Sequence, residues 1–536
     1  MLVNRSVRRT SSAGGARRAA RWRLPASLAV GALVAVPGVA LLDSAAQSSA
    51  SQVTTLQIGI GSTTLPNPAT STTDTDFASI QFSVAYEPIF HKAVSGAIEP
   101  ALATSWQYLN SSPATRNEVF EFTLRSGAAF SDGSAVTAAN VAAWLEYFVH
   151  STGPWKGVLG TNPVITATGP LTVRIQMTSP NPDLPQLLSD GGPNIGWVVG
   201  PKALADPNLL NSETDGAGQY MLVPSQTLSG DHYTYVPNPY FFDKAAIKFK
   251  EVYIKVIADP SSRLEAQETG QLNVEIGDAT TAAAATSAGL QVLSAPDGVM
   301  FLTLDTEHHL SPPLQNLKVR QALNYAIDRP AIAKALFGSL GVPSSVFITS
   351  DLGAVNANYY SYDPAKAKAL LAAAGYSKGF SLTALTQGTY FGNFGEPLVQ
   401  AVAQYLQTLN IGLTITSYPT DPIYATHVFD FQAPLNNLAD GDEVTPLAFS
   451  TYVAPGAVAN FAGTNATLDR LYSEGARSTN PDKYWSEMWK QYSIDADQLP
   501  TVVLPNIYYV SKGIGGVVAN DLHNSALVPE FYPTGS

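Results

Sequence analysis

The order of strands and helices is clearest in residues 252–276, which read VYIKVIADPSSRLEAQETGQLNVEI. Apolar and polar side chains alternate at both ends of this segment, as they do in half-buried strands: Val252, Ile254 and Val256, then Leu272, Val274 and Ile276. Between them, Asp259-Pro260 is a helix start and Gly270 is a helix stop. The segment therefore predicts a β-α-β unit, which indicates a parallel sheet.

The residues before this unit follow the same pattern. Leu56–Ile60 predicts a first strand, and Phe120, Phe122 and Leu124 alternate with polar residues in another. A turn at Asp132-Gly133 separates the second strand from a helix that Thr137 caps, and the apolar face of this helix has helical spacing: Val141, Trp144, Leu145 and Phe148.

The residues after the unit also alternate between strand and helix. Phe301–Leu304 predicts a strand. Four helices are expected after this strand: 319–327, Arg329-Pro330 to Phe337, Asp363-Pro364 to Gly375, and Pro397 to Leu409. A further strand is expected at 413–415. A chain of 536 residues is too long for one hydrophobic core, so we expect two α/β lobes.

The N-terminal residues have the layout of a secretory signal. Seven arginines lie between Arg5 and Arg23, an apolar stretch runs from Leu24 to Leu42, and small residues follow up to Ala46. We therefore expect export, with residues 1–46 as a signal peptide. Because the apolar stretch is long for a signal, an uncleaved membrane anchor is the alternative.

Composition excludes several classes of protein. The chain has no cysteine, which excludes disulfides, thiol catalysis and cysteine-ligated metals. Without residues 1–46, which hold seven arginines and one aspartate, 23 basic and 41 acidic residues remain, a net charge of −18. A surface this negative repels phosphate backbones, so nucleic acid is not an expected partner.

Motifs for catalysis and cofactors are sparse. The chain has no G-x-S-x-G, no H-E-x-x-H and no G-x-x-x-x-G-K-[ST] sequence. Glu307-His308-His309 is the best metal candidate, but neighbouring side chains on an extended segment point to opposite sides, which favours a solvated loop. Gly59-Ile60-Gly61 lacks the third glycine of a dinucleotide-binding motif and reads as a turn. No cofactor and no metal site are predicted.

Four segments resemble the family 5 extracellular solute-binding proteins of ABC transporters, which bind peptides, dipeptides and nickel. Residues 121–141 are similar to the family's "LR-x-G-x-x-F-x-DG-x-x-x-TA-x-DV" signature. Three further segments agree in order with "GTGPY … NP-x-Y", "VRQALNYAIDR" and "YDP-x-KAK-x-LL-x-x-AGY": 216–241, 318–329 and 362–376. The resemblance runs from about Tyr86 to about Asn520.

This resemblance implies a class II periplasmic-binding-protein fold, α/β, with two lobes, a hinge and an extra subdomain in the first lobe. The implied boundaries are 47–298 for the first lobe with an inserted subdomain at about 99–212, 299–504 for the second lobe, and 505–536 for a C-terminal return to the first. The ligand is expected between the lobes, which close on it. No chemistry is implied, so the chain is not expected to be an enzyme.

The resemblance also implies substrate-binding residues. Dipeptide binders of the family hold the ligand's α-ammonium group with the aspartate of a "W-x-x-D" stretch, which corresponds to 437–440 here, with Asn437 in place of the tryptophan. An ordinary acidic turn is the alternative for this segment. The expected substrate-binding residues are Asp440, Asp442, Asn437, Tyr86, Glu87 and Asp305.

The expected function is that of the extracytoplasmic substrate-binding component of an ABC importer, which captures peptides or similar small solutes. The expected partners are this ligand and the membrane permease of the transporter, and the chain is expected to act as a monomer at a periplasmic or cell-surface location. Alternatives are a binder of a nickel chelate, oligosaccharide or opine, a secreted hydrolase, and an adhesin or signalling receptor that has kept the binding fold.

Overall fold

The computed structural model describes most of the chain after residue 52. The described residues are 53–61, 67–71, 76–110, 112–153, 155–347, 359–387, 394–419, 421–440, 445–457, 459–519 and 526–534. The predicted secretory segment, residues 1–46, lies outside them. Among the described residues, no helix combines the length and the apolar character needed to cross a membrane.

The described residues form one large mixed sheet and three small ones. The strands of the large sheet are β1 (Thr55–Ile60), β8 (Tyr220–Leu222), β9 (His232–Pro237), β10 (Glu251–Val256), β11 (Val274–Ile276), β12 (Gln291–Thr303), β13 (Val342–Pro343), β14 (Phe380–Gln387), β15 (Ile411–Tyr418), β16 (Leu435–Asp440) and β17 (Gln498–Val510). Their order is β15-β14-β16-β12-β17-β11-β1-β10-β9-β8, and β13 also pairs with β17.

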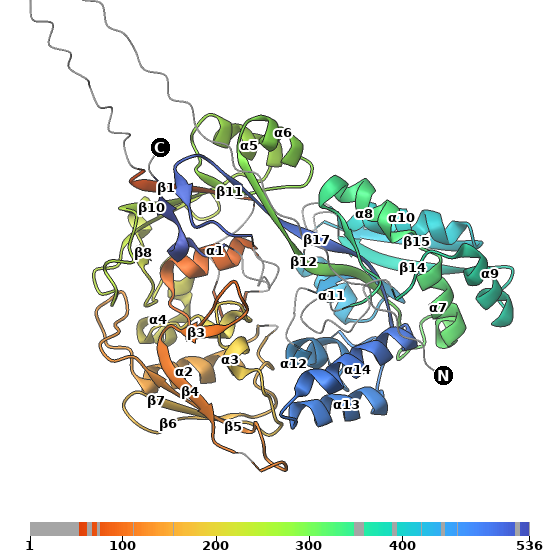
Figure 1. The fold of residues 1–536 in the computed structure, drawn as a ribbon, viewed down its shortest axis with the longest axis horizontal. Coiled ribbons are helices and arrows are strands. Elements are labelled where there is room, and N and C mark those ends of the chain that lie inside the picture. Colours follow the sequence, from red (N-terminus) through yellow and green to blue (C-terminus); the bar gives the residue numbers. More distant parts are fainter. Residues whose placement is uncertain are drawn as a thin grey trace, which may run out of the picture. The chain divides into compact units, whose positions relative to one another are not determined.

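Two long strands connect the halves of this sheet (Figure 1). Near β11, the first part of β12 pairs with the last part of β17, from Gln291↔Val510 to Pro296↔Pro505. Near β16, the pairing resumes at Val299↔Val503 after a register shift. Because proline has no N–H to donate, the ladder is interrupted where two prolines face each other. We call residues 296–299 and 503–505 the crossover.

The first lobe comprises β11, β1, β10, β9 and β8 with the elements packed on them. Its helices are α1 (Asp76–Ala85), α2 (Ala138–Val149), α3 (Leu184–Leu187), α4 (Pro201–Ala205), α5 (Pro260–Glu268) and α6 (Ala282–Ser287). A separate four-stranded sheet has the order β4-β5-β7-β6: β4 (Ala103–Tyr108), β5 (Val119–Leu124), β6 (Val164–Ala167) and β7 (Thr172–Gln176). One hydrophobic cluster joins both sheets of this lobe. The remaining strands pair in twos: β2 (Phe90–Lys92) with β3 (Ile98–Pro100), and β18 (Ile514–Gly515) with β19 (Tyr532–Pro533).

In the second lobe, helices pack on both faces of the sheet formed by β15, β14, β16 and the adjoining part of β12. Met300 and Leu302 face one cluster, whereas Phe301 between them faces another, as alternation along a strand requires. The helices are α7 (Leu317–Tyr325), α8 (Arg329–Phe337), α9 (Pro364–Ala373), α10 (Gly395–Gln407), α11 (Asp421–Phe429), α12 (Thr445–Ala448), α13 (Ala466–Ala476) and α14 (Pro481–Asp495). The first four contribute to one cluster and α11 to α14 contribute to the other.

Most of the expected elements are confirmed. Residues 252–276 form β10, α5 and β11, with Asp259 as the N-cap of α5, and both strands run parallel to β1, which lies between them. Thr137 caps α2 through a reciprocal bond with Asn140. The strand expected over Phe301–Leu304 is wrong in extent, because β12 begins ten residues earlier and passes Pro296 by means of the register shift.

Candidate ligand-binding site

The carboxyl ends of parallel strands from both lobes point toward the crossover. In the first lobe, β1 is parallel to β11, and β11 is antiparallel to β17, so that Ile276 pairs with Tyr508 and Gly277 bonds to Ile507. In the second lobe, β14 and β16 are parallel, and Asp440 at the end of β16 pairs with Val299. In open α/β sheets, ligands bind outside the carboxyl ends of the strands. The crossover is therefore the candidate site.

On the second-lobe side of the crossover, Asn437 lies next to Gly395, the first residue of α10. Its Nδ2 donates to Thr386 Oγ1 at 3.1 Å, whereas its buried Oδ1 has no hydrogen-bond partner among the described residues. Gly395 opens α10 against this pair, and a Cβ there would approach the Gln387 carbonyl oxygen to 2.6 Å. The helix N-terminus, with its partial positive charge, is thus held next to an unsatisfied amide.

Asp440 and Asp442, the acidic residues expected to bind the ligand, come shortly after Asn437 in the chain. The backbone of Asp440 is placed by its pairing with Val299, one residue past the register shift. The side chain of Asp440 lies outside the described residues, and so does the whole of Asp442. What the structure gives for Asp440 is therefore its position at the crossover.

Tyr86 and Glu87 lie in the first lobe, directly after α1. Tyr86 is 3% exposed, and burial raises its pKa. Glu87 is near Arg125, Asp190 and His91; burial raises its pKa to about 8, with Asp190 adding to the rise and Arg125 opposing it. Burial lowers the pKa of His91, but the 2.6 Å hydrogen bond to Asp190 and the negative charges of Asp190, Glu530 and Glu99 together outweigh this effect and raise the pKa to about 9. Nothing here places Tyr86 or Glu87 at the crossover.

Asp305 lies at the opposite end of β16 from Asp440. Its N–H bonds to Pro434, which precedes β16, whereas Asp440 ends that strand, so the two aspartates are separated by about 20 Å. Asp305 is fully buried; Oδ1 accepts from His308 N and Nδ1, and Oδ2 accepts from Leu310 N. This geometry favours a structural role, in which Asp305 holds its own loop.

The loop that contains Glu307-His308-His309 is exposed, as expected. His308 stacks on Phe431 with 3.8 Å between ring centroids. Over the part of the chain that is described, no group of three or more histidine, aspartate or glutamate side chains could hold a metal ion.

Glu275 is a buried acid that the sequence did not single out. It lies in β11, two residues before the turn toward the crossover, and is 0% exposed. Both carboxylate oxygens lack a hydrogen-bond partner among the described residues, because the nearby Arg263 donates to the carbonyl groups of Ile257 and Ile276 instead. Burial raises the pKa of Glu275 to about 8, although Arg263 opposes the rise.

Thr386 and Gly395 were also missed. The sequence offered no signal for Thr386, and for Gly395 it offered only the proline two residues later, at which the helix is expected to start. Neither residue type is distinctive in a sequence, because their role depends on the approach of β16.

A model of the bacterial extracellular solute-binding proteins, family 5 Middle, matches residues 97–457. The chain belongs to this family. Among curated relatives, the nickel-binding periplasmic protein of Escherichia coli K12 is 28% identical over 325 residues, 58% of this chain and 59% of that protein. The glutathione-binding protein GsiB of Salmonella paratyphi A is 26% identical over 313 residues, 56% of this chain and 58% of that protein. The chain thus matches about six-tenths of the length of these family 5 relatives.

Solved structures of solute-binding proteins share the fold of this family 5 chain. AgaA from A. tumefacien R10, in complex with agropinic acid, has a TM-score of 0.76 at 22% identity and covers 90% of this chain and 99% of its own. A dipeptide-binding protein from Pseudoalteromonas sp. SM9913, in complex with Met-Leu, has a TM-score of 0.75 at 16% identity, over 90% of this chain and 100% of its own. The expected class II periplasmic-binding-protein fold, with two lobes, a hinge and an extra subdomain, is confirmed.

Proposed function

We propose that this chain is the substrate-binding component of an ABC importer and captures a peptide or a similar small solute between its lobes, without catalysis. One observation carries the proposal: the carboxyl ends of parallel strands in both lobes converge on the crossover between β12 and β17. A ligand placed there contacts both lobes, so its binding energy favours their closure.

The chemistry of the second-lobe side suits a zwitterionic ligand. The N-terminus of α10, whose N-cap Phe394 makes no side-chain capping bond, favours a carboxylate group. Asp440 at the end of β16 is the candidate partner for an ammonium group, since an ion pair is strong where water is excluded. A peptide carries both groups, one at each end.

A non-peptide solute is the second candidate. AgaA, which has the fold of this chain, holds agropinic acid, and a curated relative binds nickel. Asn437, where dipeptide binders have tryptophan, removes an aromatic surface from the site and is compatible with a more polar ligand.

The proposal includes the location, the partners and the division of the chain. Residues 1–46 act as a signal peptide or as an uncleaved anchor, and the exported chain works as a monomer with a membrane permease in the periplasm or at the cell surface. The lobes comprise 47–298 with an inserted subdomain at about 99–212, 299–504, and a return at 505–536. The register shift at the crossover supports the limits at 298–299 and 504–505.

A thermal-shift screen tests the function. Di- to octapeptides, sugars, opines and metal chelates are added singly, because a ligand that binds only the folded state raises the melting temperature. A shift with peptides supports the first candidate, and a shift with opines or chelates alone supports the second. Turnover of a bound peptide, detected by mass spectrometry, would contradict a non-catalytic role.

A further inference from the structure

The two lobes touch at a second place, apart from the strands that connect them. The turn before β5 in the first lobe meets the C-terminal end of α13 in the second. Asn117 Nδ2 donates to the Ala476 carbonyl oxygen at 3.0 Å, and Arg116 Nη1 donates to the Arg477 carbonyl oxygen at 3.0 Å. The Arg477 guanidinium group lies 3.6 Å from the Glu118 carboxylate.

The first-lobe side of this contact is held in shape by its own lobe. Asn117 has a left-handed backbone with φ of 61°, a conformation that asparagine tolerates better than most residues. Its carbonyl oxygen accepts from Asn181 N at 2.9 Å, and the Glu118 carbonyl oxygen accepts from Met177 N at 2.8 Å. The donors are therefore positioned before the lobes meet.

The second-lobe side offers acceptors that a helix cannot satisfy alone. The last carbonyl groups of α13 have no partner in the next turn and lie at the negative end of the helix dipole. Arg116 brings a positive charge to this end, and Asn117, which is 8% exposed, brings a buried donor. Residues of the first lobe thus cap a helix of the second.

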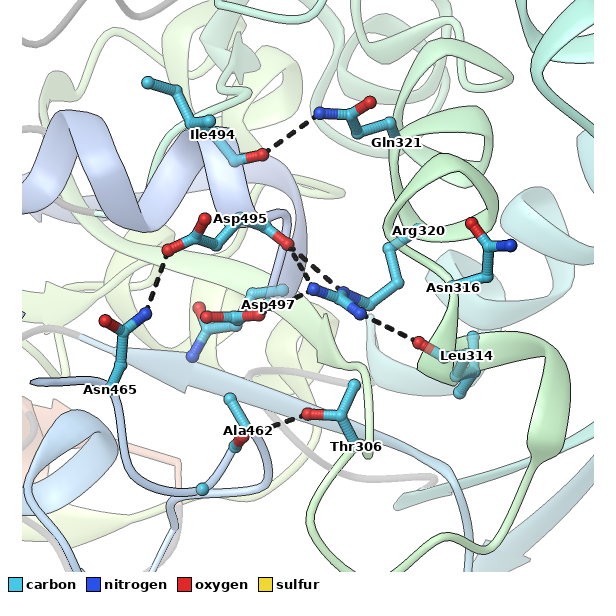
Figure 2. A network of polar contacts seen from close by, with 12 residues as sticks. Thr306, Leu314, Asn316, Arg320, Gln321, Ala462, Asn465, Ile494, Asp495 and Asp497 are labelled. Carbon is cyan, nitrogen blue, oxygen red and sulfur yellow. Dashed lines mark hydrogen bonds and ion pairs between the residues drawn. The ribbon is translucent and has the colours of Figure 1, made fainter. Parts of the chain in front are cut away.

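The helix that is capped in this way is fixed to the body of the second lobe. At its other end, the N-cap Asn465 donates from Nδ2 to Asp495 Oδ2 at 3.0 Å, as Figure 2 shows. The carbonyl oxygen of Asp495 in turn accepts from Arg320 Nε and Nη2 at 3.1 and 2.8 Å, which links α14 to α7. A displacement of α13 therefore requires that the lobe move with it.

We propose that Arg116, Asn117 and Glu118 of the first lobe and Ala476 and Arg477 of the second form a latch that stabilises the closed arrangement of the lobes independently of any ligand. Only the benefit of the latch rests on the proposed function: if the lobes are partly closed before the ligand arrives, less of the binding energy is spent on closing them. Its existence is tested on the ligand-free chain.

The test variant is Asn117→Asp. Aspartate has nearly the same shape and tolerates the left-handed backbone, but it places an acceptor against the Ala476 carbonyl oxygen in place of a donor. Asn162→Asp is the matched control, because Asn162 is also left-handed, with φ of 50°, and lies exposed in the same lobe. Loss of one hydrogen bond and the new repulsion should lower the ratio of closed to open molecules roughly tenfold.

Pulsed electron paramagnetic resonance measures this ratio. The chain has no cysteine, so Thr166→Cys and Ser473→Cys, both at exposed positions, give one spin label in each lobe. We expect a longer label-to-label distance to gain population in Asn117→Asp and in Asn117→Gly, which also keeps the backbone shape, but not in Asn162→Asp.

Two outcomes overturn the latch: distance distributions of both Asn117 variants that equal that of the parent chain, or an equal change in Asn162→Asp. Circular dichroism melts identify a variant that fails to fold, and two substitutions at Asn117 give two independent readings. If no compound in the thermal-shift screen raised the melting temperature, the proposed function would be contradicted. The label-to-label distances, which are measured on the ligand-free chain, would be unaffected by that result.

Discussion

Replacing Glu275 with glutamine should stabilise the protein, and more so as the pH rises. The pKa of Glu275 is raised from 4.5 to about 8 in the folded chain. At about 1.4 kcal/mol for each tenfold change in an ionisation constant, this corresponds to roughly 5 kcal/mol when the group is ionised in both states. The raised pKa means that the folded state favours the protonated acid, so the cost is absent below pH 4.5, grows with pH and is complete above pH 8.

Glutamine has the same shape and no charge to bury, so Glu275→Gln removes this cost. Linkage gives an advantage over the parent chain of about 1 kcal/mol at pH 5, about 3 kcal/mol at pH 7 and about 4 kcal/mol at pH 8. Urea unfolding of both proteins at these pH values measures the difference, with Glu265→Gln, at an exposed position of α5, as control. A difference that is the same at pH 5 and pH 8 would show that Glu275 is ionised beside Arg263, and the reasoning would be refuted.

Three further substitutions separate binding from folding. Asp440→Ala should weaken ligands with a free α-amino group in calorimetry and leave N-acetylated ligands little changed; an equal loss for both would make Asp440 structural. Thr137→Ala should cost about 1 kcal/mol in urea unfolding, because Thr137 and Asn140 cap α2 reciprocally; an unchanged midpoint would contradict that role. Asp305→Ala should cost about 2 to 3 kcal/mol of stability without altering ligand affinity, and weaker binding at unchanged stability would return Asp305 to the site.

Local signals in the sequence were sufficient for the helices and strands that have a clear cap or a clear side-chain pattern. Asp259 and Thr137 each cap a helix where the side-chain pattern places one, because capping depends on neighbours three residues away. The extent of β12 was not predictable in this way. Pro296-Asp297-Gly298 has the composition of a turn, and only the partner strand β17, two hundred residues later, keeps the chain extended there.

In the candidate site, too, some residues could be predicted from the sequence pattern, whereas others depend on contacts with distant segments. Asp440 and Asn437 could be found because a family pattern runs through them, and their strand ends at the crossover. Asp305 was expected near the cleft from the family resemblance, but its bonds to His308 and Leu310 depend on how the following loop folds back. The contact between Asn117 and Ala476 joins residues 359 apart, and no pattern within either segment indicates the other.

The position of β17 has a consequence for the order of folding. This strand lies inside the large sheet, between β12 and β11, and it comes from residues 498–510 near the end of the sequence. A growing chain has neither lobe complete until these residues have left the ribosome, since β17 pairs with strands of both. Both lobes therefore stay incompletely folded until synthesis of the chain is nearly finished.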